Sequence, residues 1–249
     1  MLLVVSVVGI YYFNFQSPAG GDLLSYKNES NKPHKLVLAD GSIVTLKPHS
    51  SLEYPETFSA ESREVHLYGE AFFQVKRNPQ KPFSVYSEDI VTKVLGTSFN
   101  VQAFENKKDI VVSVKTGKVS VATKVEHKKQ KEDPSEQLKG VLITRNQQIT
   151  YSKKNRKITK QLVSEPVLRN AKPGAFTFED KPVAEIFQKL ERAYGIDIIF
   201  DREVMSQCRL TTKLDNTEFY DKLRLICKGL NAKYEILDAH VIISGEGCQ

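Results

Sequence analysis

The sequence contains no tryptophan, and it has only two methionines and three cysteines among its 249 residues. Cys208, Cys227 and Cys248 all lie near the C-terminus, with 18 and 20 residues between successive cysteines. This spacing matches no zinc site, and no histidine lies beside the cysteines at ligand spacing. The absence of tryptophan, with Phe and Tyr mostly at inward strand positions, also argues against an aromatic platform for a glycan.

Recognisable catalytic and phosphate-binding motifs are also missing. The sequence has no glycine-rich phosphate loop and no nucleophile elbow. Its five histidines are isolated from one another and lie in expected strands or loops: His34, His49, His66, His127 and His240. No two of them have the spacing of metal ligands. We therefore expect no enzyme of an ordinary kind, no metal and no cofactor.

Positive charge is in slight excess, but its arrangement is not that of a nucleic-acid-binding protein. The net charge is +6, and residues 171–249 contain 11 Lys and Arg against 13 Asp and Glu. The remaining 25 basic and 17 acidic residues lie upstream, scattered through strand-like segments and a linker. No helix-turn-helix, zinc finger or RNA-binding strand motif accompanies them. We expect no nucleic-acid partner, and a surface close to a membrane explains the charge equally well.

Strict alternation of apolar and polar residues dominates the region from residue 34 to residue 152. It is clearest in REVHLYGEAFFQV and in KPFSVYSEDIVTKVLGTSFNVQAF, which follow each other almost without a spacer. Such alternation predicts short, half-buried strands. Gly69, Gly96 and the Asn78-Pro79 pair supply the turns between them. The sequence predicts hairpins about Asp40-Gly41 and about Thr116-Gly117.

Two segments inside or after this region lack the alternation. Residues 124–139 are nearly all charged and predict a solvated loop. Residues 153–174 form a basic, poorly patterned connector that ends at Pro173-Gly174.

The N-terminal segment MLLVVSVVGIYYFNF is uncharged and almost entirely apolar. Fifteen helical residues span about 22 Å, which is less than the roughly 30 Å of a bilayer core. A signal peptide is the competing interpretation, but there is no basic residue before Lys27 and SPAGGD is a poor cleavage site. We predict that residues 1–15 are the outer part of a transmembrane helix whose upstream half precedes Met1. Residues 16–33 would then be a juxtamembrane tether.

From Ala175 the period changes from two residues to 3.6. Residues 175–180 predict a strand, and a helix follows with apolar positions Val183, Ile186, Phe187, Leu190 and Tyr194, ending at Gly195. Two strands precede a second helix capped by Asn216 or Thr217. Its apolar positions are Phe219, Leu223, Ile226, Cys227 and Leu230. A final hairpin turns at Asp238-Ala239, so residues 175–249 predict a small α+β domain with the order β-α-β-β-α-β-β.

The cysteine count is odd, which in an exported protein suggests one disulfide and one free thiol. Cys227 lies on the apolar face of the second helix and is expected to be a small core residue. This favours Cys208 and Cys248 as the disulfide pair.

Three segments resemble the FecR family, whose members are periplasmic receptors and anti-sigma factors. Leu38 to Phe58 (LADGSIVTLKPHSSLEYPETF) is similar to the opening segment of that family, and GEAFFQV and LGTSFNV are similar to its two most typical motifs. The α+β segment resembles the domain that follows in Bacteroidota-type members, which is similar to the short N-terminal domains of secretins and TonB-dependent receptors. FTFEDKPVAEIFQKLERAYGIDIIF (Phe176 to Phe200) carries most of that resemblance. The expected fold is a mainly β FecR-like domain over 34–152, with short strands in a sandwich or solenoid-like arrangement, followed by the α+β domain.

The resemblance implies a function in signalling. It implies a single-pass inner-membrane protein with residues 17–249 in the periplasm, which binds the signalling domain of a TonB-dependent outer-membrane transducer. An extracytoplasmic-function sigma factor would be held only by a cytosolic segment that this sequence lacks. The alternative is a stand-alone exported binding module for a glycan or a surface partner.

The resemblance also draws attention to Gly96-Thr97, because some FecR-like proteins cleave themselves at the matching bond. A threonine hydroxyl can attack the preceding carbonyl when the turn is strained and the oxyanion is stabilised. The simpler interpretation, which we favour, is that Gly96 makes a turn and Thr97 begins a strand.

Overall fold

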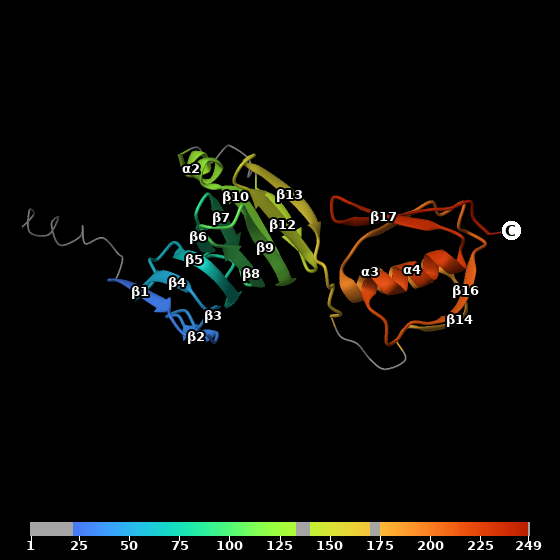
Figure 1. The fold of residues 1–249 in the computed structure, drawn as a ribbon, viewed down its shortest axis with the longest axis horizontal. Helices are drawn as coiled ribbons and strands as arrows, with labels where there is room; N and C mark the ends of the chain where they lie inside the picture. The colour runs from blue at the N-terminus through green and yellow to red at the C-terminus, as the bar shows by residue number, and fades with distance from the viewer. Residues whose placement is uncertain (1–21, 133–139, 170–174, 249) are drawn as a thin grey trace, which may run out of the picture.

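The structure is a computed structural model that describes residues 22–132, 140–169 and 175–248. A large β domain is followed along the chain by a smaller α+β domain (Figure 1). The segment predicted to be a transmembrane helix, residues 1–15, lies outside the described residues. Within the described ranges, no helix combines the length and the apolar character needed to cross a membrane.

The β domain consists of short strands that form one continuous hydrogen-bonded sheet, bent into two halves. Its strands are β1 (Leu23–Asn28), β2 (His34–Val37), β3 (Ile43–Leu46), β4 (Ser50–Pro55), β5 (Arg63–Gln74), β6 (Phe83–Ser87), β7 (Ile90–Val94), β8 (Ser98–Ala103), β9 (Asp109–Thr116), β10 (Lys118–Thr123), β11 (Val141–Thr144), β12 (Gln147–Ser152) and β13 (Lys157–Leu162). The main path runs β11-β10-β7-β6-β5-β8-β9-β12-β13, and β1 to β4 join it through β5.

The long strand β5 belongs to both halves of the sheet. Its first part pairs with β4 and β6, and its last part pairs with β3 and β8. The change of partners occurs at Gly69, whose φ is +92°. A Cβ atom there would overlap the side chain of Ser50, whose Oγ accepts a hydrogen bond from Glu70 N at 2.8 Å. Glycine therefore fits the positive φ and the close approach of Ser50 at the point where β5 passes from one half of the sheet to the other.

The core of the β domain lies between the two halves and is supplied by the alternation seen in the sequence. Along β5 every second residue is buried, and Phe73 stacks on Phe99 of β8 with ring centroids 5.1 Å apart. The remaining core side chains come from both halves of the sheet, among them Leu46, Leu52, Val85, Ile110, Val119 and Ile149. The predicted mainly β domain is confirmed.

One predicted hairpin is confirmed and the other is wrong. Strands β2 and β3 pair about the Asp40-Gly41 turn, with Val37 opposite Ile43. Strands β9 and β10 do not pair, because β9 lies between β8 and β12 whereas β10 lies between β7 and β11. Gly117 has a φ of +88° and carries the chain from one half of the sheet to the other. Alternation identifies strands, but it does not identify their partners.

The predicted loop over 124–139 contains a helix, α2 (Lys124–Glu132), and its remaining residues lie outside the described ranges. The helix begins with a capping box. Glu126 Oε2 accepts hydrogen bonds from the backbone N–H and the hydroxyl of Thr123, at 2.9 and 2.8 Å, and Thr123 Oγ1 accepts one from Glu126 N at 3.2 Å. The T-x-x-E spacing was present in the sequence and predicts such a start.

Two segments expected to lie outside the sheet are strands at its edges. β1 falls within the expected tether of residues 16–33 and pairs with β4. β13 falls within the expected connector of residues 153–174 and pairs with β12, from Gln147 opposite Leu162 to Ser152 opposite Lys157. Both strands are largely exposed, so their composition resembles that of a loop.

The α+β domain has the predicted order of elements. They are β14 (Thr177–Pro182), α3 (Val183–Tyr194), β15 (Ile198–Phe200), β16 (Arg209–Lys213), α4 (Phe219–Gly229), β17 (Lys233–Leu237) and β18 (His240–Ser244). Strand β14 pairs with β16, and β15, β18 and β17 form a second sheet in that order. The two helices lie between these sheets (Figure 1).

The helix boundaries follow the sequence signals closely, with one exception. The predicted inward residues of α3 are buried, and Gly195 ends the helix in the left-handed conformation with φ of +67°. The predicted cap of α4 by Asn216 or Thr217 is wrong, because Glu218 precedes the helix without a side-chain cap. Thr217 instead donates its hydroxyl hydrogen to Leu214 O at 2.9 Å.

Gly69→Ala is expected to destabilise the β domain more than Gly41→Ala does. Both glycines have positive φ, +92° and +81°, so both substitutions should cost about 1–2 kcal/mol of backbone strain. Only at Gly69 does the new methyl group also overlap backbone and side-chain atoms of Ser50, whereas at Gly41 it meets the flexible Lys76 side chain at 3.6 Å. Urea unfolding of both variants measures the difference, and equal losses would contradict the proposed role of Gly69.

Candidate interaction sites

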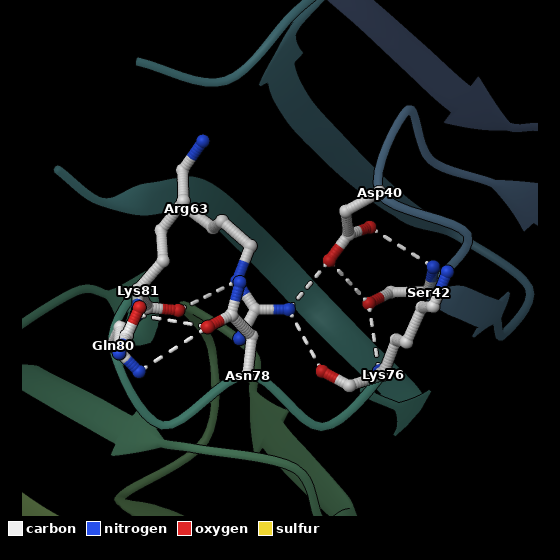
Figure 2. Close-up of polar contacts among 7 residues, drawn as sticks. All are labelled: Asp40, Ser42, Arg63, Lys76, Asn78, Gln80 and Lys81. Atoms are coloured by element: carbon white, nitrogen blue, oxygen red, sulfur yellow. Dashed lines mark hydrogen bonds and ion pairs between the residues drawn. The ribbon is translucent and has the colours of Figure 1, made fainter. Parts of the chain in front are cut away.

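A buried arginine connects three segments of the β domain. Arg63 is 2% exposed at the start of β5. Its guanidinium donates to Asp40 Oδ2 at 2.6 Å, to Lys76 O at 2.9 Å and to Lys81 O at 2.9 Å. Figure 2 shows how it joins the β2–β3 turn to the loop that precedes β6. The guanidinium also lies over the ring of Phe83, 5.4 Å from its centroid. The sequence signal was a charged residue at an inward position of the β5 alternation.

The Asp40 carboxylate is stabilised in its charged form. Burial by itself would raise the pKa of Asp40, but hydrogen bonds from Ser42 and Arg63 outweigh it and lower the pKa below its usual value. Ser42 N and Ser42 Oγ donate to the two carboxylate oxygens at 2.9 and 2.7 Å. The cluster is therefore a structural ion pair. It belongs to the framework of the domain, because none of its charged groups is open to a substrate.

Gly96 and Thr97 lie in a crowded turn immediately before β8, which begins at Ser98, one residue after the predicted start at Thr97. Gly96 has a φ of +153°, and a Cβ atom there would overlap the backbone of Arg77. Thr97 is 4% exposed, and its hydroxyl donates to Lys118 O at 3.0 Å. Its carbonyl accepts a hydrogen bond from Val75 N at 3.0 Å. Both residues thus have a packing role in the turn, and the Thr97 hydroxyl hydrogen already has a partner.

The structure places the three cysteines in the α+β domain. The sulfur atoms of Cys208 and Cys248 form a disulfide with Cα atoms 5.1 Å apart. Cys227 is a free cysteine, 4% exposed on α4, and burial raises the pKa of its thiol to about 11. A neutral, buried thiol is unreactive at neutral pH. Among the described residues, no group of His, Cys, Asp and Glu is arranged to hold a metal ion.

A second buried cation, Lys222, lies in the first turn of α4. Lys222 is fully buried, and its ammonium donates to the carbonyls of Leu214 and Thr217 and to the hydroxyl of Thr217. It also lies 4.9 Å from the centroid of the Phe176 ring. Burial lowers the pKa of Lys222. These contacts hold the loop that precedes α4 against the first turn of the helix. Lys222 was not among the residues predicted to face inward, although it lies three residues after Phe219, which was.

An open cavity of about 770 Å³ lies at one end of the β domain. Its lining includes Tyr68, which is 51% exposed, together with His49 and Phe104. Glu88, on its wall, forms an ion pair of 2.6 Å with Lys153, while its buried Oε1 has no hydrogen-bond partner. His49 and Glu88 both have positive φ. The cavity is accessible, its lining combines polar and aromatic side chains, and it is large enough for a small ligand.

Asn146 of the β domain is hydrogen-bonded to the connecting segment and to the α+β domain. Asn146, in the left-handed conformation between β11 and β12, is 2% exposed. Its Nδ2 donates to Tyr194 O at 2.7 Å and to Val167 O at 3.0 Å, and its Oδ1 accepts from Val167 N at 2.9 Å. Tyr220 Oη donates to Val163 O at 2.7 Å. The connecting segment is therefore hydrogen-bonded to both domains.

Comparisons with known proteins agree on one family. The profile described as "FecR protein" matches residues 25–120, and the profile described as "FecR, C-terminal" matches residues 175–243. No curated protein matches the chain.

Two solved structures are similar over most of the chain. Both are crystal structures, at 2.50 and 1.65 Å resolution, of a protein from Parabacteroides distasonis ATCC 8503 described as a "putative anti-sigma factor". Each is 27% identical and covers 89% of this chain and 98% of its own, with TM-scores of 0.50 and 0.49.

Asp40→Asn is expected to make the free energy of unfolding depend less on pH in the acid range than it does in the parent protein. The folded-state pKa of Asp40 is lowered, so its contribution is fully present above the unfolded pKa of about 3.9 and is lost as pH falls through the folded pKa. Urea unfolding at pH 7 and pH 3 measures the difference for both proteins. The variant should have a lower free energy of unfolding than the parent at pH 7, and the difference between the two proteins should be smaller at pH 3. A gap that is unchanged by pH would contradict the assignment.

Mass spectrometry of the non-reduced protein tests both the cysteines and the Gly96-Thr97 bond. We expect a linked peptide pair containing Cys208 and Cys248, and a Cys227 that alkylates only after denaturation. We also expect an uncut peptide that spans Gly96-Thr97. A bridge to Cys227, or fragments that end at Gly96 and disappear in Thr97→Val, would contradict these expectations.

Proposed function

The chain belongs to the FecR family of anti-sigma factors, which are regulators of signalling, and we propose that it is the signal-receiving region of such a regulator. In this proposal residues 17–249 lie in the periplasm and residues 1–15 lead into a single inner-membrane helix. The region binds the signalling domain of a TonB-dependent outer-membrane transducer. An extracytoplasmic-function sigma factor is held by a separate cytosolic segment and is released after the transducer signals.

The observation that carries this proposal is the number of sheet edges that the structure leaves exposed. β1, β2, β11 and β13 lie at edges of the large sheet, and β17 and β15 lie at the edges of a small one. Edge strands present unpaired N–H and C=O groups to solvent, and another protein can pair with them by strand addition. A protein–protein contact therefore suits this surface.

Gly96-Thr97 has a structural role in this proposal. The Thr97 side chain is buried, and its hydroxyl donates to Lys118 O. No titratable side chain within the described residues has a hydrogen bond to that hydroxyl that would make it a general base.

A second candidate function is supported by the open cavity. The rings of Tyr68 and Phe104 lie in its lining together with polar side chains, among them Lys27, Glu105 and Asn106. This arrangement favours the alternative of a stand-alone binding module for a glycan or another polar ligand.

Binding between purified residues 17–249 and the signalling domain of the transducer encoded beside its gene tests the proposal. We expect a direct complex in titration calorimetry, with tighter binding at low salt if the partner surface is acidic. A proline placed where an edge strand donates its N–H should weaken the complex and leave the unfolding transition intact. The proposal fails if no signalling domain binds while a soluble glycan binds tightly, and in that case the cavity becomes the functional site.

A further inference from the structure

β17 is the outermost strand of its sheet and is unusually exposed. In the described part of the chain it pairs with β18 alone, from Lys233 opposite Ser244 to Leu237 opposite His240. Ile236 is 42% exposed and Leu237 is 63% exposed. By contrast, Val241 and Ile243 of the neighbouring β18 are buried. A strand with a free edge and exposed apolar side chains is suited to accept a further strand.

Helix α4 runs below this edge and contributes positive charge. α4 contacts β17, and Figure 1 shows the two elements extended in a similar direction. A groove of about 480 Å³ lies where they meet, and it is lined by Arg224, Lys228, Lys233, Tyr234 and two small residues. We call these four named residues and the free edge of β17 the β17–α4 groove.

The charges in the β17–α4 groove are only partly neutralised. Arg224 pairs with Asp221 at 2.8 Å, but both side chains are largely exposed, at 71% and 46%. For Lys228 and Lys233 the described residues provide no ion-pair partner within 4 Å. Glu235 is the acidic residue on β17 itself. Residues 171–249 have more acidic than basic residues overall, so the groove is a local positive surface on a slightly acidic domain.

The spacing of these charges matches that of a strand. Arg224 and Lys228 are four residues apart on α4, which places them about 6 Å apart along the helix axis. Side chains at positions i and i+2 of a strand point to the same face and are roughly 6.6–6.8 Å apart. A strand added beside β17 would therefore place two successive side chains of its inner face over Arg224 and Lys228. Carboxylates at those two positions would complement the groove.

We propose that the β17–α4 groove binds an extended acidic segment, with carboxylates at positions i and i+2, which adds as a strand to β17. The proposal deepens the proposed function, since the segment is taken to belong to the partner's signalling domain. The backbone of the segment pairs with β17, and its two carboxylates meet Arg224 and Lys228. Its remaining apolar side chains cover the exposed end of β17.

A disulfide-cyclised hairpin peptide tests the groove without the partner domain. One strand of the peptide has Asp at i and i+2 on one face and Val on the other, and a control peptide has Lys in place of Asp. We expect the Asp peptide to shift the amide signals of β17 and α4 in heteronuclear NMR, and the Lys peptide to leave them unchanged. Arg224→Glu with Lys228→Glu should weaken binding at least about tenfold, since it replaces two attractive charge pairs by repulsive ones.

The matched control is Lys181→Glu with Lys213→Glu, which changes the net charge equally on the β14–β16 sheet, across the helix layer from β17. This control should bind the Asp peptide as the parent does. The proposal that the groove binds an acidic strand is overturned if the Asp peptide does not bind, or if both double variants weaken its binding equally. The signalling domain is titrated separately against the same variants. If the signalling domain binds the parent and all variants equally, it does not use the β17–α4 groove, and the proposed function stands. If it binds neither the parent nor any variant, the proposed function fails. In that case the peptide titration still shows whether the groove binds an acidic strand.

Discussion

The bend of β5 at Gly69 is the constraint on which the β domain depends. One strand supplies the seam between the two halves of the sheet, because its first part pairs with β4 and β6 and its last part with β3 and β8. Only a residue without a Cβ fits beside Ser50 at that point. Arg63 then holds the start of the same strand to the β2–β3 turn and to the loop before β6. The position of β5 between the two halves of the sheet therefore depends on the lack of a side chain at Gly69 and on the buried ion pair of Arg63 with Asp40.

Period and turn chemistry predicted the buried strands and the helices of the α+β domain. They did not predict helix α2, the edge strands β1 and β13, or which strands pair. Alternation identified β5 and its buried positions, and the switch to a period of 3.6 at Val183 located the α+β domain. The partners of β9 and β10 could not be deduced, because Thr116-Gly117 reads as a hairpin turn locally and its role depends on distant strands. Exposed edge strands such as β1 lack alternation, because neither face is buried deeply.

The candidate sites were predictable only where one residue type has a strong local meaning. The apolar period of α4 predicted that Cys227 is buried on one face of the helix. This favoured Cys208 and Cys248 as the disulfide pair. The roles of Arg63 and Asn146 depend on carbonyl groups brought together from distant segments, which no local pattern encodes. Both do leave a trace in the sequence: Arg63 is a polar residue at an inward position, and Asn146 is a residue that tolerates positive φ in a two-residue turn.

The junction of the two domains limits how a signal received at one of them can reach the other. Asn146 binds the end of α3 and the connecting segment, and β17 contacts β13 of the large sheet. A partner at the edge of β17 therefore lies close to the junction. A bound partner changes the β domain only if it binds two arrangements of this junction with different affinity. The hydrogen bonds of Asn146 are the interactions in which two such arrangements would differ, because a single side chain makes them on both sides of the connection.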